Sequence, residues 1–596
     1  MKNLAAAIGV LFYLTGATQM IEWHNQWINS SAGYYHYGNN QYTKGAYTTL
    51  ALNIFSGSTD LDPGPASLSI GEGALIETIN DSGGISEWIH IPGSLSVNTL
   101  VRDDDQNIYM LGSHDAIVDL QAGAGEFNTS FAQGVFLVKL DPLYNVIWMR
   151  EFPDMVIGGF DLLTNNIQYS HHLSLDASNN IYITGTFNGT IDFDPGAGVV
   201  NLSNSGQNDA FLLKLNSSGN YQWVISYNGF SYSEGNYVTV DSSGNPIIIG
   251  AFNSPIDVDP GPGVTILNAN GSELFVCKYS PAGSLIWAKE IGTPSAPCSG
   301  HKIVCDLSDN IVIQGTYLGQ VDVDPGAGTY TLNSGNSANL FISTLDTNGE
   351  FEWAQGLHST GSNLITGGLA VSAFGKVYFS FYSEGDTYLD SRNCSNLVRT
   401  DNSVGIIASY DASGNFLNHI AIEGDIDSQA GFLNAGLDSS ENLYVSGMFI
   451  GTVDLNPGPC YDPIDYGFET GGFSLTKINY SGENCQLLHS GCTDFTACNY
   501  NAYAQCDNGK CIYIIAGCSN PEACNYEPEV YCSDDSTCVF PGCTYPGACN
   551  YNSDAGCDDG TCDFHSCACT GDFNNDGFVG ISDLLQFVGV YGTVCD

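Results

Sequence analysis

The sequence predicts an all-β protein, namely a seven-bladed β-propeller followed by small disulfide-rich repeats and a short loop–helix calcium motif. Three observations support this prediction: a unit of about 65 residues that recurs along the chain, an array of regularly spaced cysteines, and one acidic 12-residue loop near the C-terminus. The predicted boundaries are 1–17 for a signal peptide, 18–490 for the propeller, 491–566 for three cysteine-rich repeats and 567–596 for the calcium-binding segment.

The chain begins with a segment typical of export. A lysine at position 2 precedes an apolar run over 4–14, and small residues follow at 15–17. One positive charge, about ten apolar residues and a small-residue end are typical of a secretory signal peptide; a buried N-terminal strand is the alternative. The run is shorter than the ~20 apolar residues that a membrane-spanning helix needs, so we expect a secreted or cell-surface protein without a membrane span.

The composition excludes one class of partner. The chain has 14 Lys+Arg against 64 Asp+Glu, which gives a formal net charge of −50. A surface this negative repels phosphate backbones, so we expect no nucleic-acid binding. A hydrophobic content of 43% is too high for a disordered acidic chain, and the molecule should therefore bury a large core.

The repeat is marked by an Asp-x-Asp-Pro-Gly string. Each full unit contains four short segments rich in β-branched and aromatic residues and separated by Gly, Asn, Asp or Pro, as in the fourth copy at 236–244, 245–252, 274–283 and 284–291. Four antiparallel strands repeated seven times describe a β-propeller. The strings stand at 60–64, 192–196, 257–261 and 322–326, with a variant that has Asn456 as its third residue at 454–458, a degraded copy at 119–123 and a remnant around Asp390.

Turn residues and tryptophans fix the order of the strands within a unit. Asp-x-x-x-Asn favours a tight turn between the first two strands, because both side chains bond the nearby backbone. Trp23 lies 65 residues before Trp88, so we predict that residues 20–28 form an outer strand that completes the seventh blade and closes the ring. The Asp/Asn pairs are 103/107, 176/180, 241/245, 306/310 and 438/442, and the tryptophans of the last strand are Trp88, Trp148, Trp223, Trp287 and Trp353.

These units resemble the secreted bacterial β-propeller repeat family, whose pattern is D..GN.Y..G.F.G..D.DPG followed by F..KLD..G...W. The resemblance covers about residues 20–490 and implies the fold and a bacterial, exported protein. Blades two and six depart from the Asp-Pro-Gly pattern, and blade six has Asn418 at the tryptophan position. The resemblance does not indicate a ligand.

Two features of the propeller predict possible chemistry. The paired carboxylates Asp192/Asp194, Asp257/Asp259 and Asp322/Asp324 offer oxygen ligands for Ca²⁺, although the same residues also shape a turn. His171 and His301 occupy equivalent positions on predicted innermost strands and are expected to face the propeller axis. Cys298 and Cys305 flank His301 and are expected to pair or to lie in the core rather than to bind zinc. No catalytic motif stands in a suitable context, so no catalytic residue is assigned.

The cysteine array predicts cross-linked repeats. Units of about 25 residues cannot build a sufficient core, so four cysteines per unit should form two disulfides, with three possible connectivities within a unit. Zinc binding is the alternative, but CxxC knuckles are absent. The units resemble short GC…ACNY…C repeats near the C-termini of secreted bacterial proteins, which implies a semi-rigid spacer. The cysteines are Cys492, Cys498, Cys506 and Cys511; Cys518, Cys524, Cys532 and Cys538; and Cys543, Cys549, Cys557 and Cys562.

The last motif, DFNNDGFVGISD at 572–583, has the spacing of a calcium loop. Glycine at position 6 permits the sharp turn, and the apolar residues after the loop recur at helical spacing. The stretch resembles one half of a type I dockerin, which implies calcium-dependent docking to a partner. Cys569 and Cys595 bracket it and are expected to form a staple, while Cys567 stays unpaired or bonds Cys485. The expected Ca²⁺ ligands are Asp572, Asn574, Asp576, the carbonyl of Phe578, and Asp583.

Together these features predict an extracellular binding or adhesion protein. The propeller would present a surface to a glycan or protein ligand on a disulfide-stabilised stalk, and the calcium motif would dock a further partner. Two alternatives are a glycan-active hydrolase or lyase with a propeller catalytic domain, and a purely structural cell-surface component.

Overall fold

The computed structural model divides the chain into two compact units, which are residues 1–457 with 462–485, and residues 486–596 with 458–461. Each unit is described by itself below. The residues that the structure describes are 21–29, 40–44, 47–54, 59–60, 69–80, 85–121, 126–153, 155, 159–161, 166–168, 171–269, 271–293, 296–335, 337–361, 364–390, 396–398, 403–423, 429–454, 463–465, 472–478, 489–491, 504–507, 518, 520–526, 538–563, 571, 573–574 and 578–590.

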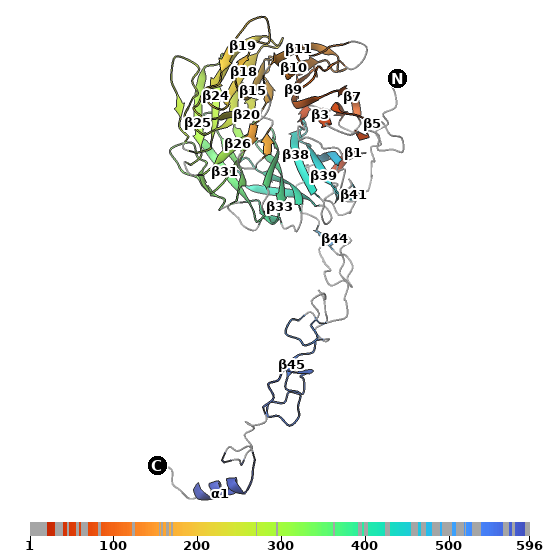
Figure 1. Cartoon of the computed structure of the whole chain (residues 1–596), viewed down its shortest axis with the longest axis vertical. Helices are drawn as coiled ribbons and strands as arrows, with labels where there is room; N and C mark the ends of the chain where they lie inside the picture. Colours follow the sequence, from red (N-terminus) through yellow and green to blue (C-terminus); the bar gives the residue numbers. More distant parts are fainter. Residues whose placement is uncertain are drawn as a thin grey trace. The chain divides into compact units, whose positions relative to one another are not determined.

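Seven antiparallel sheets stand around a common axis in the first unit (Figure 1). The prediction of an all-β, seven-bladed propeller is therefore confirmed. From the axis outward, blades 1 to 4 are β2 (Asn40–Lys44), β3 (Tyr47–Ile54), β6 (Gly73–Asn80) and β7 (Ile85–Pro92); β8 (Leu95–Arg102), β9 (Ile108–His114), β10 (Gly134–Leu140) and β11 (Val146–Pro153); β14 (His172–Leu175), β15 (Ile181–Phe187), β18 (Asp209–Leu215) and β19 (Tyr221–Tyr227); and β20 (Ser233–Val240), β21 (Pro246–Phe252), β24 (Glu273–Tyr279) and β25 (Leu285–Ile291).

The remaining three blades continue the same order and close the ring. Blades 5 to 7 are β26 (Cys298–Cys305), β27 (Ile311–Tyr317), β30 (Asn339–Leu345) and β31 (Phe351–Ser359); β32 (Leu364–Val371), β33 (Val377–Glu384), β36 (Ser403–Tyr410) and β37 (Phe416–Glu423); and β38 (Gln429–Leu437), β39 (Leu443–Ile450), β42 (Gly472–Ile478) and β1 (Ile21–Asn29). The outer strand of blade 7 thus comes from the N-terminal end of the described chain, where β1 pairs antiparallel with β42. This pairing joins segments about 450 residues apart and leaves blade 7 with the same four strands as the other blades.

Short two-stranded hairpins accompany the blades. Those between the second and third strands contain the Asp-Pro-Gly strings, except in blade 6, where β34 and β35 enclose the remnant around Asp390. The hairpins are β4 (Thr59–Asp60) with β5 (Ser69–Ile70), β12 (Gly159–Asp161) with β13 (Asn166–Gln168), β16 (Thr190–Asp192) with β17 (Asn201–Ser203), β22 (Ile256–Asp257) with β23 (Ile266–Leu267), β28 (Gln320–Asp322) with β29 (Thr331–Asn333), β34 (Thr387–Tyr388) with β35 (Leu397–Val398), and β40 (Thr452–Asp454) with β41 (Pro463–Asp465).

The core of the propeller lies between the blades. Seven clusters of buried apolar side chains are described, and each joins two consecutive sheets. One of them joins Leu50 and Leu75 of blade 1 to Tyr444 and Leu475 of blade 7. Since burial of one large apolar side chain contributes about 1.5–3 kcal/mol, these interfaces, rather than any single sheet, stabilise the ring.

The Asp-x-x-x-Asn turn works as the sequence predicts. In blade 4 the Oδ1 atom of Asp241 accepts hydrogen bonds from the backbone N–H of Ser243 (2.9 Å) and of Asn245 (2.8 Å). The Asn245 amide donates to the other carboxylate oxygen at 2.8 Å, and Gly244 takes a φ of 80°, which favours glycine. Lys278 of β24 then pairs with the same carboxylate at 2.8 Å, and both side chains are buried. The turn is therefore anchored to the third strand of its own blade.

The tryptophan and glycine of the repeat connect blades 3, 4 and 5 each to the next blade. The indole N–H of Trp353 in blade 5 donates to the backbone carbonyl of Ala412 in blade 6 at 3.0 Å, and the ring occupies the space where a Cβ on Gly414 would lie. Gly414 has a φ of 74°. Equivalent contacts join Trp223 to Pro281 and Gly283, and Trp287 to Thr347 and Gly349.

The described residues of the second unit form short bridged turns and one helix, α1 (Ile581–Val590). Their short strand pairs are β43 (His489–Gly491) with β44 (Ala504–Asp507) and β45 (Pro541–Gly542) with β46 (Cys557–Asp558), both parallel. The Ala-Cys-Asn-Tyr motif closes the second repeat, because the Cys524 N–H donates to the Val539 carbonyl at 2.7 Å and Asn525 accepts from the Val539 N–H at 2.8 Å. Across the described part of the chain, no helix has the length and apolar character that crossing a membrane requires.

Candidate functional site

In the three Asp-x-Asp-Pro-Gly turns whose side chains the structure describes, the first carboxylate accepts backbone hydrogen bonds. Asp192 Oδ1 accepts from the N–H of Asp194 (3.1 Å) and of Val200 (2.8 Å), and Asp194 Oδ1 accepts from Gly196 N–H (2.8 Å). Gly198 leaves the space in which the second carboxylate lies. The same contacts recur for Asp257 with Asp259 and Thr265, Asp259 with Gly261, Asp322 with Asp324 and Tyr330, and Asp324 with Gly326.

Blade 2 separates the roles of the two aspartates. Asp119 there still accepts from two backbone amides, at Gln121 (3.0 Å) and Phe127 (2.7 Å), although a glutamine replaces the second aspartate. The first carboxylate is therefore a turn-shaping acceptor with or without a second one beside it. Binding of metal by these turns stays a prediction, and the side chains of the copies at 60–64 and 454–458 lie outside the described residues.

The histidines predicted to face the axis do not do so. His171 is 2% exposed and packs inside its blade against Gly185 and against Phe211, with 5.6 Å between ring centroids. Burial lowers the pKa of His171 to about 4. His301 is also buried, and its Nε2 lies 2.9 Å from the Thr316 hydroxyl. The prediction that these two histidines face the axis is wrong. At His301 a β-bulge shifts the alternation of inward and outward side chains by one residue.

The two cysteines beside His301 do not pair. Cys298 and Cys305 lie at opposite ends of β26, where they oppose Tyr317 and Ile311 of β27. Seven residues of extended strand span about 23 Å, far beyond the reach of a disulfide. Both thiols are free, and Cys298 is buried in the core between blades 4 and 5. The expectation that they pair is wrong, whereas a core position is correct for Cys298.

The side chains that meet at the axis belong instead to other residues of the innermost strands, three of which follow a bulge. Lys302 follows the bulge of β26, Tyr237 that of β20 and Asn434 that of β38. His172 lies 65 residues before Tyr237, at the equivalent place in blade 3. These four residues and Tyr42 of β2 form the axial cluster. All five are half-buried, so solvent reaches them although inner strands surround them.

Contacts across the ring show that these side chains converge. The Lys302 ammonium donates to Asn434 Oδ1 at 3.2 Å, although the two residues belong to blades 5 and 7. Side chains of non-adjacent blades can touch only where the innermost strands approach the axis. The His172 ring stacks on Tyr237 with centroids 3.4 Å apart and an interplanar angle of 21°. The cluster thus offers a stacked aromatic pair, an amide and an ammonium.

The electrostatics of the axial cluster leave one charged group near neutral pH. Burial, and secondarily the positive charge of Lys302, lowers the pKa of His172 to about 3, so the imidazole stays neutral. Burial lowers the pKa of Lys302 to about 8, which keeps most of it protonated at pH 7. Burial also raises the pKa of Tyr42 and of Tyr237 to about 12. Among the five side chains, only Lys302 therefore carries charge.

The C-terminal loop is described in part. The buried carboxylate of Asp583 accepts hydrogen bonds from the backbone N–H of Phe573 (2.8 Å), Asn574 (3.2 Å) and Gly580 (2.7 Å). Position 12 of the loop is thereby held against positions 2 and 3, which is the closure that a 12-residue calcium loop requires. Phe578 is exposed. The proposed ligands Asp572 and Asp576 lie outside the described residues.

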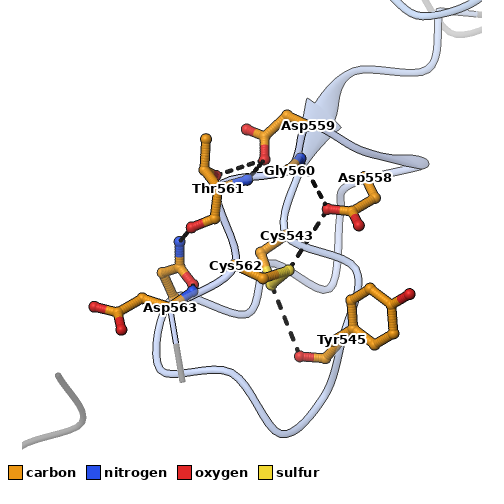
Figure 2. Close-up of a disulfide and its surroundings, with 9 residues drawn as sticks. Cys543, Tyr545, Asp558, Asp559, Gly560, Thr561, Cys562 and Asp563 are labelled. Atoms are coloured by element: carbon orange, nitrogen blue, oxygen red, sulfur yellow. Dashed lines mark hydrogen bonds between the residues drawn. A yellow bond between two sulfur atoms is a disulfide. The ribbon is translucent and has the colours of Figure 1, made fainter. Parts of the chain in front are cut away.

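The disulfides of the second unit follow a pattern that the repeat spacing did not reveal. The first and fourth cysteines of a repeat bond each other, as Cys518–Cys538 and as Cys543–Cys562, the latter enclosed by the turn at 558–563 (Figure 2). The second cysteine of one repeat bonds the third of the next, as Cys524–Cys557. The prediction that each repeat contains two disulfides of its own is therefore wrong. Of the other candidates, Cys549 is bonded, whereas the side chains of Cys492, Cys498, Cys506, Cys511, Cys532, Cys569 and Cys595 lie outside the described residues.

Comparison with known proteins identifies no family. No protein-family model matches the chain. An uncharacterised WD repeat-containing protein of Acanthamoeba polyphaga mimivirus is 24% identical over 219 residues, which is 32% of this chain. The chain spans only 15% of the length of that curated relative.

Solved structures with a similar arrangement also differ widely in sequence. One is an ulvan lyase, a polysaccharide lyase, with a TM-score of 0.36 and 10% identity over 71% of this chain and 93% of that chain. Another is a protein of unknown function from Dyadobacter fermentans, with a TM-score of 0.33 and 10% identity over 78% of this chain and all (100%) of that chain. Likenesses this distant add nothing to the fold that the strand pairing already shows.

Proposed function

We propose that the protein is an extracellular binding protein, exported by a bacterium, whose propeller holds a glycan or protein ligand at the axial cluster. The supporting observation is the convergence of five polar or aromatic side chains from five different blades. Aromatic rings with a few polar groups beside them are typical of ligand sites. The disulfides of the second unit suit an oxidising, extracellular compartment and a stalk role for the repeats.

The C-terminal loop would bind Ca²⁺ and dock a further partner. The described residues fit this role, since Asp583 closes the loop and Asn574 and Phe578 occupy ligand positions 3 and 7. The bound ion would neutralise the acidic loop and fix its shape. The apolar side chains of Leu584, Leu585 and Val588 on α1 are exposed and could then meet the partner.

A glycan-active enzyme is the weaker candidate. Most glycosidases use two carboxyl groups that flank the scissile bond. None of the five side chains of the axial cluster is a carboxylate. The cluster is therefore better suited to hold a ligand than to cleave one, and we assign no catalytic residue.

The test uses the full-length protein on glycan and protein arrays, with wild type compared to Tyr237→Ala and to Ile286→Ala. Tyr237 belongs to the axial cluster, whereas Ile286 is an exposed outer-strand residue that serves as the matched control. We expect a ligand that wild type and Ile286→Ala bind and Tyr237→Ala loses. A ligand that Tyr237→Ala retains in full, with the fold intact, would place binding elsewhere on the surface.

A further inference from the structure

The solvent side of helix α1 carries an apolar stripe. Four aliphatic side chains recur at positions i, i+3, i+4 and i+7 and so lie on one face of the helix. These residues, which we call the α1 stripe, are 61–78% exposed: Ile581, Leu584, Leu585 and Val588. A helix of a folded domain normally buries such a stripe against other elements. The stripe is therefore placed for a contact that the described part of the chain does not supply.

Another side of the helix is occupied by the C-terminal loop. The buried Asp583 carboxylate accepts hydrogen bonds from the N–H groups of Phe573 and Asn574. The Phe587 ring packs on Phe573, with 5.1 Å between the ring centroids. Asp583 and Phe587 are four residues apart and share a face that is turned away from the α1 stripe. The contacts with the loop thus fix the orientation in which the helix presents its stripe to solvent.

The charges around the α1 stripe limit what can cover it. The sequence has no Lys or Arg after position 510, whereas the loop at 572–583 contains Asp572, Asp576 and Asp583. A helix that lies on an anionic membrane surface uses basic residues on its polar face, and this segment has none. Apart from Asp583, the polar side chains of the helix are Ser582 and Gln586. The segment thus offers no cation to an anionic lipid and few hydrogen bonds to an unrelated protein.

A second copy of the chain meets these conditions. The stripe itself carries no charge, and its spacing is that of the a, d and e positions through which helices of a bundle pack together. Gly589 lies one turn after Leu585, and a Cβ there would meet nothing within 4 Å, so a neighbouring helix has room to approach. A net charge of −50 makes two copies repel each other elsewhere, which limits their attraction to the stripe.

We propose that the α1 stripe pairs two copies of this chain, and that calcium in the loop at 572–583 promotes the pairing. Each calcium ion offsets two of the negative charges that a copy brings to the contact. Four side chains per copy cover less than the ~800 Å² per partner of a standard interface, so we expect a reversible dimer with a dissociation constant on the order of 10 µM. The proposal rests on the proposed function, because it names the partner that the C-terminal segment docks.

The experiment is sedimentation-velocity ultracentrifugation of the full-length protein over a range of concentrations, in calcium and in EDTA. Two variants with neighbouring substitutions form a matched pair: Leu585→Glu places a charge on the stripe, and Gln586→Glu places the same charge on the helix outside it. An unpaired charge is costly to bury, so Leu585→Glu should raise the dissociation constant of the dimer at least tenfold. Gln586→Glu should change it less than threefold, and EDTA should weaken the wild-type dimer at least threefold.

Calcium titration calorimetry shows whether the loop stays intact in each variant. If Leu585→Glu disturbs calcium binding, Val588→Gln takes its place, because it makes the far end of the stripe polar without adding a charge. This variant should keep calcium binding and weaken the dimer at least threefold.

The outcomes separate the pairing from the calcium site. If wild type binds calcium but stays monomeric, or if a stripe variant with an intact loop dimerises as wild type does, the pairing is overturned while calcium binding stands. If the chain binds no calcium and stays monomeric, the proposed role of the loop is overturned as well. Equal dimerisation in calcium and in EDTA would overturn the link between loop and stripe. If the protein is monomeric and binds phosphatidylglycerol vesicles through Leu585, the stripe contacts lipid and the pairing is overturned.

Discussion

The contact between tryptophan and glycine across blades can be isolated by replacing two glycines that share one backbone geometry. Gly414 and Gly335 both have positive φ, 74° and 67°. A Cβ on Gly335 meets nothing within 4 Å, whereas a Cβ on Gly414 would overlap the ring of Trp353. Gly335→Ala thus measures the cost of the backbone conformation alone, and Gly414→Ala measures that cost together with the loss of the interblade contact.

The structure gives the expected loss of folding free energy for each of the two alanine variants. An L-residue in the left-handed region costs about 1–2 kcal/mol, and alanine regains part of this by restricting the unfolded chain, so Gly335→Ala should cost about 1 kcal/mol. In Gly414→Ala the Trp353 ring must also move. It is 7% exposed and donates to Ala412 at 3.0 Å, so loss of the hydrogen bond and of part of the burial should add about 2–3 kcal/mol.

Thermal unfolding of the full-length protein checks these values. The propeller spans about 460 residues, from β1 to β42, and unfolding entropies of ~2.1 cal/mol/K per residue give about 1 kcal/mol per degree for a cooperative ring. We expect Tm to fall by about 1 °C in Gly335→Ala and by about 3–4 °C in Gly414→Ala. In a Trp353→Ala background, Gly414→Ala should cost no more than Gly335→Ala. Equal shifts for the two single variants would refute an interblade role for the glycine.

Three further results are expected. Lys278→Met should destabilise the propeller by about 3–5 kcal/mol, because it leaves Asp241 buried without its ion partner; urea unfolding measures this, and a cost below 1 kcal/mol would contradict it. Burial alone would raise the pKa of Asp241, but hydrogen bonds from Lys278 and Asn245 hold this pKa below its ordinary value. The stabilisation that ionised Asp241 provides is therefore present above pH ~4 and lost on acidification. The urea midpoint measured against pH should show this loss. Peptide mapping without reduction should find Cys498 bonded to Cys532, by the rule of Cys524–Cys557, and a bond from Cys498 to its own repeat would break that rule. Asp583→Ala should remove one Ca²⁺-binding event in calorimetry of the full chain; unchanged binding would exclude the loop.

Repetition made the fold predictable from the sequence. A unit that recurs seven times gives several independent copies of the same strands, turns and spacing. A strand or turn that is unclear in one copy can be assigned from the equivalent residues of another. The N-terminal strand is the plainest case, since the distance from Trp23 to Trp88 indicates a strand without a blade of its own, and β1 indeed pairs with β42.

The same repetition concealed the axial cluster. Its members on blades 3, 4, 5 and 7 occupy similar places but differ from one another, with histidine, tyrosine, lysine and asparagine at 172, 237, 302 and 434. No consensus marks them, and in blades 4, 5 and 7 the preceding bulge reverses which of two neighbouring residues turns toward the axis. Sequence reasoning chose His171 and His301, whereas the cluster contains the residues that follow them, His172 and Lys302. A systematic search for residues that break the repeat pattern on the innermost strands would have found the cluster.

Disulfide connectivity was unpredictable for a different reason. A repeat of four cysteines suggests that all four bond within the repeat. The spacing of the cysteines is the same, however, if one of them bonds a cysteine of the next repeat instead. The parallel bridge between Gly542 and Asp558 brings the third cysteine, Cys557, beside the entry to its own repeat, within reach of the preceding repeat's Cys524. The disulfide Cys524–Cys557 therefore links the second repeat covalently to the third.

Part of the acidity of the protein follows from how its turns are built. The first aspartate of the Asp-Pro-Gly turn and that of the Asp-x-x-x-Asn turn each bind two backbone amides, and a ring of seven blades needs these turns many times. Lysine side chains are few, and those that form ion pairs lie where a carboxylate is buried or where two blades meet.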